Sequence, residues 1–317
     1  MQEILKGIVK GVDLGGWMSQ CDYSRERLDT FITEADFAQI ARWGFDHVRL
    51  PVDYDVIQNA DGSLIEEGLR RVDRAVELAG RYGLSLVLDL HKAQGYSFDP
   101  GEQESGFFES ERCQSYFYAV WEGFARRYGA LSERVVFDLL NEITEERYLP
   151  AWKRISRECV RRIRQDAPRT RILLGSYWWN SARALPDLDA PYDGRVIYNF
   201  HCYEPHAFTH QGAYWMPELK DRTGLRYADC GASEAFFEDF LAPALAKAER
   251  EGAALYCGEY GVIDTVPPEE ALGWLRDLHA VFERHGIGRC IWSYREMDFG
   301  IRDGRWDALR SRLLELI

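Results

Sequence analysis

Eight short apolar runs alternate along the chain with longer segments of helical periodicity. Strands are predicted over residues 8–13, 47–51, 84–90, 135–140, 171–175, 196–200, 254–257 and 289–292. Helices are predicted over residues 33–43, 66–82, 112–128, 149–165, 178–185, 234–251, 268–285 and 306–316. Apolar strands that alternate with amphipathic helices are typical of a parallel sheet whose faces are covered by helices.

Eight such units in one chain of 317 residues favour a closed barrel over an open sheet. An open sheet of this class would carry a Gly-rich phosphate loop after its first strand, and Gly11, Gly15 and Gly16 do not fit that spacing. We therefore predict the α/β class: a single catalytic (β/α)8 TIM barrel over residues 1–317, with a small insertion at 204–233 after strand six.

Composition excludes several kinds of partner. The net charge of −13 opposes binding to nucleic acid. No apolar run is long enough to cross a membrane and no signal peptide is recognised, so we expect a cytoplasmic protein, or a secreted one if a leader has been removed. The seven cysteines are scattered without paired spacings, which indicates reduced thiols and neither a disulfide framework nor a zinc site. We expect no cofactor, no metal and a monomer.

Polar and aromatic residues follow the apolar runs at the strand ends, where barrel enzymes carry their chemistry. The set comprises Arg49, His91, Asn141, Glu142, His201, Tyr203, Glu259 and Trp292. A single histidine or arginine at a strand end would be explained by hydrogen bonding within the protein. The number of such residues at one rim indicates a functional site.

Two carboxylates stand out in this set. Glu142 closes the run Val-Val-Phe-Asp-Leu-Leu-Asn-Glu, and Glu259 closes Ala-Leu-Tyr-Cys-Gly-Glu. They fall on strands four and seven, which face each other across an eight-stranded ring. A pair of carboxyl groups about 5 Å apart is the arrangement of retaining glycoside hydrolysis, with one nucleophile and one acid/base.

The strand-end residues and their surroundings are similar to those of glycoside hydrolase family 5, and the resemblance covers essentially the whole chain. It is most specific in Leu-Leu-Asn-Glu at 139–142, in residues 198–205 and 208–211, and in Tyr-Cys-Gly-Glu-Tyr-Gly at 256–261. Within the family, the chain looks most like the compact single-domain endo-β-1,4-glucanases.

The resemblance implies a role for each residue. Glu142 would be the acid/base and Glu259 the nucleophile, which Arg49 and Tyr203 would keep charged and oriented. Asn141 would bind the sugar 2-hydroxyl, and His91 and His201 would position the sugar and the acid/base. Trp292 would form the floor on which the sugar stacks, since the C–H face of a pyranose is apolar. We add Trp17, Trp178 and Trp215 as candidate sugar contacts. Of the aromatic residues in the insertion, which also suit a small packed cluster, Trp215 is favoured to face the sugar, whereas packing and sugar contact are equally supported for Trp178.

Two positions depart from the family pattern. Lys92 stands where many relatives have a second histidine, and Asp13 stands where asparagine is common. Both are expected to concern sugar contacts, so they affect the prediction of substrate and not that of reaction. The segment from Asp13 to Trp17 also resembles that of β-1,3-glucanases in the family.

The leading hypothesis is a retaining endo-β-1,4-glucanase that acts on soluble or mixed-linkage β-glucan. β-Mannanase, xyloglucanase and β-1,3-glucanase remain open, because loops read the sugar stereochemistry. A non-catalytic carbohydrate-binding barrel is disfavoured by the presence of both glutamates. A metal-dependent hydrolase ranks low because neither His91 nor His201 is part of a His-x-His or His-x-x-x-His pair.

Overall fold

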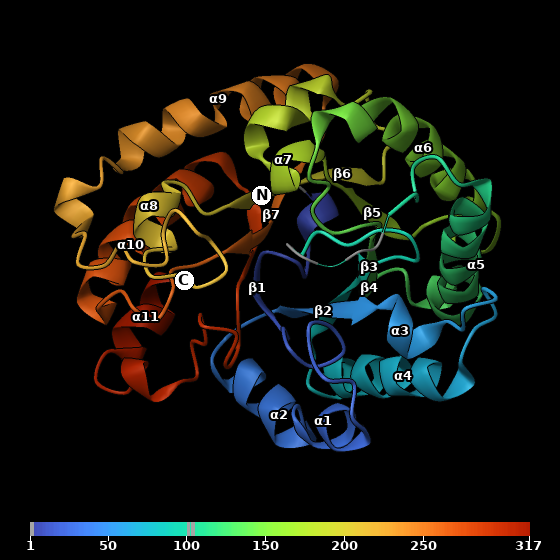
Figure 1. Cartoon of the computed structure of the whole chain (residues 1–317), viewed down its shortest axis with the longest axis horizontal. Coiled ribbons are helices and arrows are strands. Elements are labelled where there is room, and N and C mark those ends of the chain that lie inside the picture. The colour runs from blue at the N-terminus through green and yellow to red at the C-terminus, as the bar shows by residue number, and fades with distance from the viewer. Residues whose placement is uncertain (1–2, 100–101, 103–104) are drawn as a thin grey trace.

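The computed structural model describes residues 3–99, 102 and 105–317. Eight parallel strands close into a barrel in sequence order, as predicted. They are β1 (Lys10–Asp13), β2 (His47–Asp53), β3 (Ser85–Lys92), β4 (Val135–Asp138), β5 (Arg171–Leu174), β6 (Val196–Cys202), β7 (Leu255–Tyr260) and β8 (Gly288–Ile291). The helices surround this barrel (Figure 1).

The covering helices follow their strands much as the periodicity predicts. They are α1 (Arg25–Thr30), α2 (Glu34–Arg42), α3 (Tyr54–Ile57), α4 (Glu66–Arg81), α5 (Glu111–Tyr128), α6 (Leu149–Asp166), α7 (Tyr177–Asn180), α8 (His206–Thr209), α9 (Glu234–Glu251), α10 (Pro268–His285) and α11 (Arg310–Leu316). None of the helices in the described ranges is long and apolar enough to cross a membrane.

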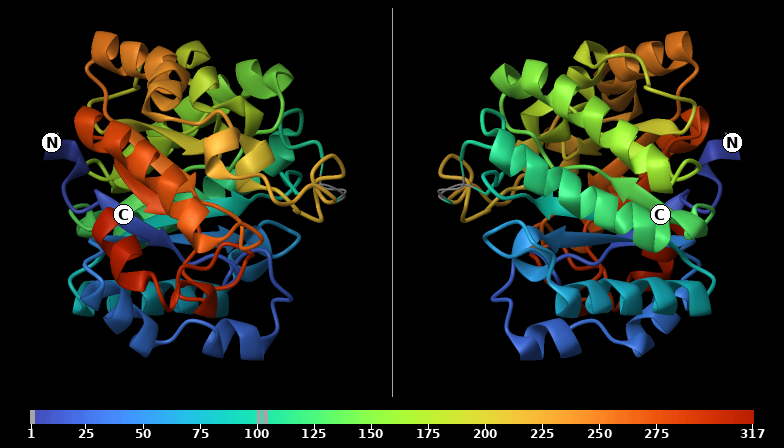
Figure 2. Two further views of the ribbon diagram at one scale, coloured as in Figure 1. Left: turned by 90° about the vertical axis from the view of Figure 1, so that its left-hand side faces the viewer. Right: turned by 90° about the vertical axis from the view of Figure 1, so that its right-hand side faces the viewer.

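The two ends of the barrel differ. Figure 2 shows the N-terminus at one end, while the loops after β3 and within the insertion at 204–233 project at the other. We call this second end, where the strands finish, the mouth. Residues 100, 101, 103 and 104 of the long loop predicted after strand three lie outside the described residues.

The barrel interior has an apolar floor and a polar layer above it. Side chains from β3 to β8 fill the floor together with two residues of the N-terminal segment: Leu5, Ile8, Val87, Val136, Leu173, Ile197, Tyr256 and Cys290. Successive side chains on a strand alternate between its faces, so the residue two positions further along points into the same interior. That period puts Asp89, Asp138 and Asn199 directly above Val87, Val136 and Ile197.

Three local predictions differ from the structure. Strand β4 ends at Asp138, so Asn141 and Glu142 stand in the loop beyond it, whereas Glu259 lies within β7. The helix predicted over residues 178–185 is instead a short turn in which Trp178, Trp179 and Asn180 all have left-handed backbones, followed by a 3-10 helix over Ala182–Asp187. Helix α1, which the periodicity does not predict, begins after an N-cap at Ser24.

Candidate active site

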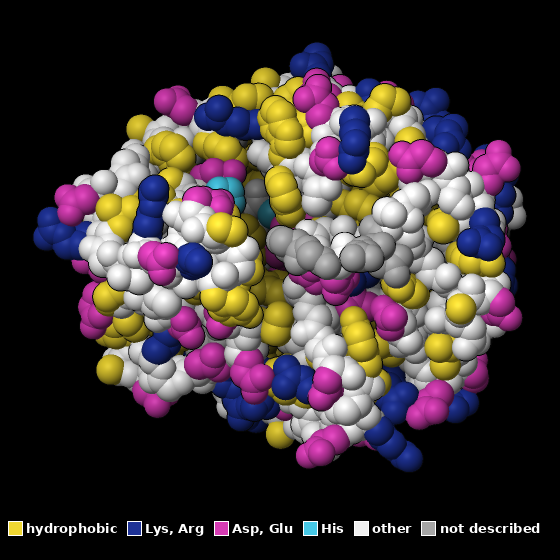
Figure 3. Space-filling view, viewed as in Figure 1, with side chains coloured by type: hydrophobic (Ala, Val, Ile, Leu, Met, Phe, Trp, Pro, Cys, Tyr) yellow, Lys and Arg dark blue, Asp and Glu magenta, His cyan; other side chains and the backbone are white. Residues whose placement is uncertain are grey.

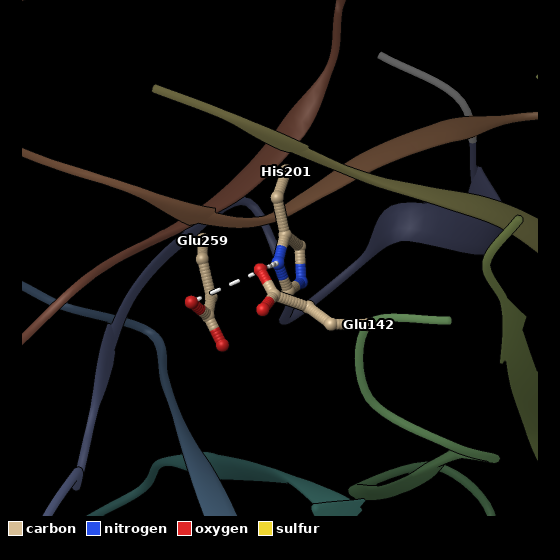
Figure 4. Close-up of side chains that lie close together, drawn as sticks. All are labelled: Glu142, His201 and Glu259. Carbon is tan, nitrogen blue, oxygen red and sulfur yellow. Dashed lines mark hydrogen bonds and ion pairs between the residues drawn. The ribbon is translucent and has the colours of Figure 1, made fainter. Parts of the chain in front are cut away.

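The two predicted carboxylates face each other at the mouth with a histidine between them. Glu142, His201 and Glu259 each offer one ligand atom, and these three atoms lie within 4.8 Å of one another. His201 Nδ1 lies 2.7 Å from Glu142 Oε1 and 3.7 Å from Glu259 Oε2. Figure 4 shows the two carboxyl groups pointing toward each other beside the imidazole.

Glu142 is held in an unusual backbone conformation. Its φ of 36° lies in the left-handed region, which a residue with a side chain rarely adopts. Tyr96 fixes this turn, because its hydroxyl donates to the Glu142 carbonyl at 2.8 Å and accepts from the Thr144 N–H at 2.9 Å. Strain of this kind persists where the surroundings impose it, and it is typical of functional sites.

Glu259 receives two strong donors. Arg49 Nη1 donates to Oε1 at 2.8 Å, and the Tyr203 hydroxyl donates to Oε2 at 2.9 Å. The Tyr203 ring is packed edge-on against His210 and Phe299, with centroid distances of 5.0 and 5.8 Å. The phenol is therefore fixed by packing as well as by its hydrogen bond.

Burial and mutual repulsion set the proton affinity of the pair. The side chains of Glu142 and Glu259 are only 12% and 7% exposed. Burial raises the pKa of Glu142 well above its usual range, and the charge of Glu259 raises it further. Burial also raises the pKa of Glu259, but the charge of Arg49 and the hydrogen bond from Tyr203 oppose that effect. When the pair holds a single proton, the donors to Glu259 therefore favour its location on Glu142.

Arg49 is the centre of a fully buried polar network. Besides Glu259, its guanidinium contacts Asp13, Asp138 and Asn141 at 3.0, 3.0 and 2.8 Å. It also lies 3.2 Å from Asp89. We call Asp13, Asp89 and Asp138 the buried acid cluster. Burial raises the pKa of Asp89 and of Asp138 to about 7 each.

Asn141 leaves a polar atom free for a ligand, and His91 is held as a neutral ring beside Trp292. Asn141 accepts from Arg49 through Oδ1, while its buried Nδ2 has no partner in the described part of the chain. His91 Nδ1 lies 2.6 Å from Asp89, and burial lowers the pKa of this imidazole to about 4, so it is neutral. Its ring is parallel to that of Trp292, with 1° between the planes and 5.8 Å between centroids.

The other tryptophans occupy different settings. Trp178 and Trp179 are 48% and 50% exposed. The backbone N–H of Trp179 donates to the carbonyl of Ile143, the residue after Glu142, at 2.9 Å. Trp215, in the insertion, is half-buried against His210, 6.1 Å between centroids. Trp17 instead lies in the core, where its indole N–H donates to the Leu28 carbonyl at 2.9 Å. Figure 3 shows the molecule from the side of the mouth, with hydrophobic side chains gathered around the centre of the view.

The two departures from the family pattern lie below and beside the site. The Asp13 side chain is fully buried and bound to Arg49, and Lys92 is buried in ion pairs with Asp99 and Glu102 at 2.6 and 2.7 Å. Neither residue is therefore placed as the expected sugar contact. Asp13 affects the charge balance around Arg49, and Lys92 pairs with acids of the loop that follows β3.

Three polar residues of the site, Asp89, Asp138 and Asn199, are not among those predicted from the sequence. Asn199 Nδ2 lies 3.1 Å from both oxygens of Asp138. Each of the three is a polar residue with apolar or aromatic neighbours on both sides in the sequence, which is the pattern that could have revealed them.

The glutamates and His201 are the one group in the described residues whose ligand atoms could meet at a metal ion. The Arg49 guanidinium already bonds Glu259, and its fixed positive charge opposes a cation there. One closely spaced histidine pair does lie elsewhere: His206 begins α8 and His210 caps its end, with 5.3 Å between the ring centroids. No third ligand joins that pair among the residues described.

Comparison with known proteins identifies the family. A family model described as cellulase (glycosyl hydrolase family 5) matches residues 9–298. Cellodextrinase A of Ruminococcus flavefaciens is 55% identical over 90% of this chain and 84% of that protein. Endoglucanase C of Acetivibrio thermocellus is 36% identical over 97% of both chains.

Solved structures agree on the fold. The crystal structure of endoglucanase Cel5A from Thermotoga maritima superposes with a TM-score of 0.85 at 24% identity, covering 99% of each chain. Because the family model spans most of the sequence, and two relatives align over nearly its full length, the chain belongs to the cellulase family, glycosyl hydrolase family 5, and is a glycoside hydrolase.

Proposed function

We propose that this glycoside hydrolase is a retaining endo-β-1,4-glucanase of soluble or mixed-linkage β-glucans. The observation that carries the proposal is the facing of Glu142 and Glu259 with their nearest ligand atoms within 4.8 Å. That separation fits the roughly 5–5.5 Å of retaining enzymes and is shorter than the roughly 6.5–9.5 Å that accommodates the attacking water of an inverting enzyme, so it suits attack by a carboxylate on the sugar. The names of the two aligned relatives support a β-1,4-glucan as substrate.

The reaction would proceed through two displacements. Glu259 attacks the anomeric carbon while Glu142 donates its proton to the departing oxygen. Water, deprotonated by Glu142, then cleaves the glycosyl ester. Glu142 needs a raised pKa for the first step, and Glu259 needs donors that keep it ionised, as found here.

The surrounding residues suit a sugar chain across the mouth. Asn141 Nδ2 is free to donate to a sugar 2-hydroxyl, and the parallel rings of His91 and Trp292 offer a platform for the sugar at the cleavage point. The leaving sugar would lie on the side of Glu142, next to Trp178 and Trp179. Trp215 would extend this wall from the insertion, whereas the core position of Trp17 gives it no direct contact.

A panel of polysaccharides tests the proposal: carboxymethyl-cellulose, mixed-linkage β-glucan, laminarin, glucomannan, galactomannan and xyloglucan. Wild type is compared with Glu142→Gln and Glu259→Gln, and with Glu109→Gln as a control on an exposed glutamate. We expect cleavage of the β-1,4-containing glucans that is lost in both active-site variants and kept in the control. Activity confined to laminarin, galactomannan or xyloglucan would refute the substrate assignment, and full activity of Glu259→Gln would refute the site.

Two measurements refine the assignment. The anomer formed first, followed by proton NMR, should be β, because double displacement retains configuration. A second candidate function, cleavage of short cellodextrins, is favoured by the relative named cellodextrinase. A cellodextrinase should have a kcat/KM for cellotetraose that greatly exceeds its kcat/KM for carboxymethyl-cellulose. An endoglucanase should instead cut the polymer internally and so rapidly lower the viscosity of its solution.

A further inference from the structure

One nitrogen of Arg49 serves two carboxyl groups. Nη1 donates to Asp13 Oδ1 at 3.0 Å and to Glu259 Oε1 at 2.8 Å. The nitrogen carries two hydrogens, so both bonds can form together. The guanidinium has a single positive charge, however, and inside a protein that charge cannot fully compensate two neighbouring anions. Asp13 and Glu259 therefore compete for it.

Asp13 is the least supported acid around this guanidinium. Asp89 has a second partner in His91 Nδ1 at 2.6 Å, and Asp138 has one in Asn199 Nδ2 at 3.1 Å. Asp13 Oδ2 and Asp89 Oδ1 are both buried without a hydrogen-bond partner among the described residues, but Asp89 receives two nitrogens on its other oxygen, whereas Asp13 shares Nη1 of Arg49 with Glu259. A buried carboxylate is costly when its donors are few, and Asp13 has only a shared Arg49 nitrogen and the weakly donating Cys290 thiol, so a proton in this cluster is best placed on Asp13.

The groups that face Asp13 come from every strand packed around it. Burial raises its pKa well above the usual range, Arg49 opposes the effect and Glu259 adds to it. The remaining charged or titratable neighbours are Asp89 on β3, Asp138 on β4, Tyr203 after β6, Tyr256 and Cys257 on β7, and Cys290 on β8.

A line of polar side chains leads from Asp13 toward the opposite end of the barrel. The Cys290 thiol interacts with the side chains of both Asp13 and Tyr256. The Tyr256 hydroxyl lies 2.6 Å from His47 Nε2, and His47 Nδ1 lies 2.5 Å from Asp46. Asp46 is partly exposed, with 34% of its side chain accessible. This line gives a proton on Asp13 a route to solvent that avoids the mouth.

The geometry points to Asp13 as a positioning residue whose proton follows the state of the nucleophile: Asp13 is a neutral acid while Glu259 is an anion, and an anion once Glu259 is esterified. The inference rests on the proposed role of Glu259. When the Glu259 oxygen bonds the anomeric carbon and the leaving oxygen departs, Glu259 loses its charge. Asp13 then releases its proton to solvent and pairs with Arg49. Hydrolysis of the ester reverses both changes.

Thermal and urea unfolding of Asp13→Asn between pH 5 and pH 8 tests the first half. A group whose folded pKa lies above its unfolded value loses stability as pH rises between the two, and asparagine has no such loss. The unfolding equilibrium should therefore shift in favour of the variant by up to about tenfold per pH unit. The exposed Asp221→Asn serves as control. A stability difference between variant and wild type that stays constant from pH 5 to pH 8 would overturn the inference, because an Asp13 that is ionised in the folded protein gives no pH dependence in that range.

Repeating the comparison in a Glu259→Gln background tests the coupling. Glutamine frees the charge of Arg49, so Asp13 becomes its anionic partner and is ionised in both the folded and the unfolded state across this range. The effect of Asp13→Asn on stability should then lose its dependence on pH and become a destabilisation of constant size. An unchanged pH dependence in the two backgrounds would show that Asp13 does not respond to Glu259. Neither experiment requires activity, so both remain decisive if the proposed function fails.

Trapping the intermediate tests the second half. Glu142→Gln, with and without Asp13→Asn, is treated with a 2-deoxy-2-fluoro cellobioside whose leaving group departs as an anion, and protons are counted with an indicator dye. We expect additional proton release only where Asp13 is present. Equal release in both variants overturns the coupling. Failure of either variant to form an adduct contradicts the role of Glu259, while the unfolding data still decide the protonation of Asp13.

Discussion

Replacement of Tyr203 by phenylalanine isolates one of the two donors to Glu259. The phenol donates to Oε2 at 2.9 Å, and its ring is packed against His210 and Phe299. Phenylalanine should therefore keep its position while the carboxylate loses a hydrogen bond. A hydrogen bond to a charged group contributes about 1.5–3 kcal/mol. Since 1.36 kcal/mol corresponds to roughly one pKa unit, we expect the pKa of Glu259 to rise by about 1–2 units.

The sign of the effect on the pH profile follows from the role of Glu259. A nucleophile must be ionised, so its pKa sets the acid limb of kcat/KM in the free enzyme. Tyr203→Phe should move that limb to higher pH by about 1–2 units. The alkaline limb, which reports Glu142, should move much less. The pH range over which kcat/KM is high would then be narrower on its acid side.

The assay is the pH dependence of kcat/KM on a chromogenic aryl cellobioside. Tyr198→Phe is the matched control, because Tyr198 is also a buried tyrosine whose hydroxyl is hydrogen-bonded, to the Asp189 carbonyl at 2.8 Å, away from the site. An acid limb that stays in place in Tyr203→Phe, or moves equally in both variants, would refute the assignment of Glu259 as the ionised nucleophile supported by Tyr203.

Three further changes probe the surroundings of the site. Trp178→Ala should lower kcat/KM for cellotetraose about fivefold through loss of stacking, with Tyr214→Ala, 76% exposed in wild type, as control; an unchanged value would exclude Trp178 as a sugar contact. Gly258→Ala places a Cβ 2.6 Å from Asn199 Oδ1 and 3.1 Å from His201 Nε2, so activity and unfolding midpoint should both fall, unlike in Gly194→Ala, where the space is open. Lys92→Met should cost about 1–3 kcal/mol in urea unfolding, because it leaves Asp99 and Glu102 without their cation; an unchanged midpoint would contradict this.

The barrel and its catalytic pair could be predicted because they depend on patterns that survive without side-chain detail. Strand and helix periods alternate throughout the chain, and parallel strands end at one rim, so polar residues that follow apolar runs must gather there. Glu142 and Glu259 needed only this argument to be placed opposite each other. Their exact positions relative to the strand ends did not follow, because strand ends are set by pairing with neighbours.

Other features depend on contacts between distant segments. The sequence from Trp178 to Leu185 has a helical composition. In the structure, however, the backbone N–H of Trp179 donates to the Ile143 carbonyl, and the backbone from Trp178 to Asn180 is left-handed. From the sequence, Asp13 and Lys92 are expected to concern sugar contacts because they replace residues that are common in the family at those positions. Whether such a side chain faces a ligand or a buried partner depends on the charges across the barrel, and for Asp13 that partner is Arg49.

The buried acid cluster explains why Arg49 is suited to support a nucleophile. A packed apolar layer would stabilise the barrel at least as well as buried charges do, so the cluster is poorly explained by stability. Its effect is geometric: Asp13, Asp89, Asp138 and Asn141 hold the guanidinium from several sides and leave Nη1 directed at Glu259. A cation fixed in this way needs no reorganisation as charge leaves the nucleophile and returns, which is the condition under which electrostatic support is most effective.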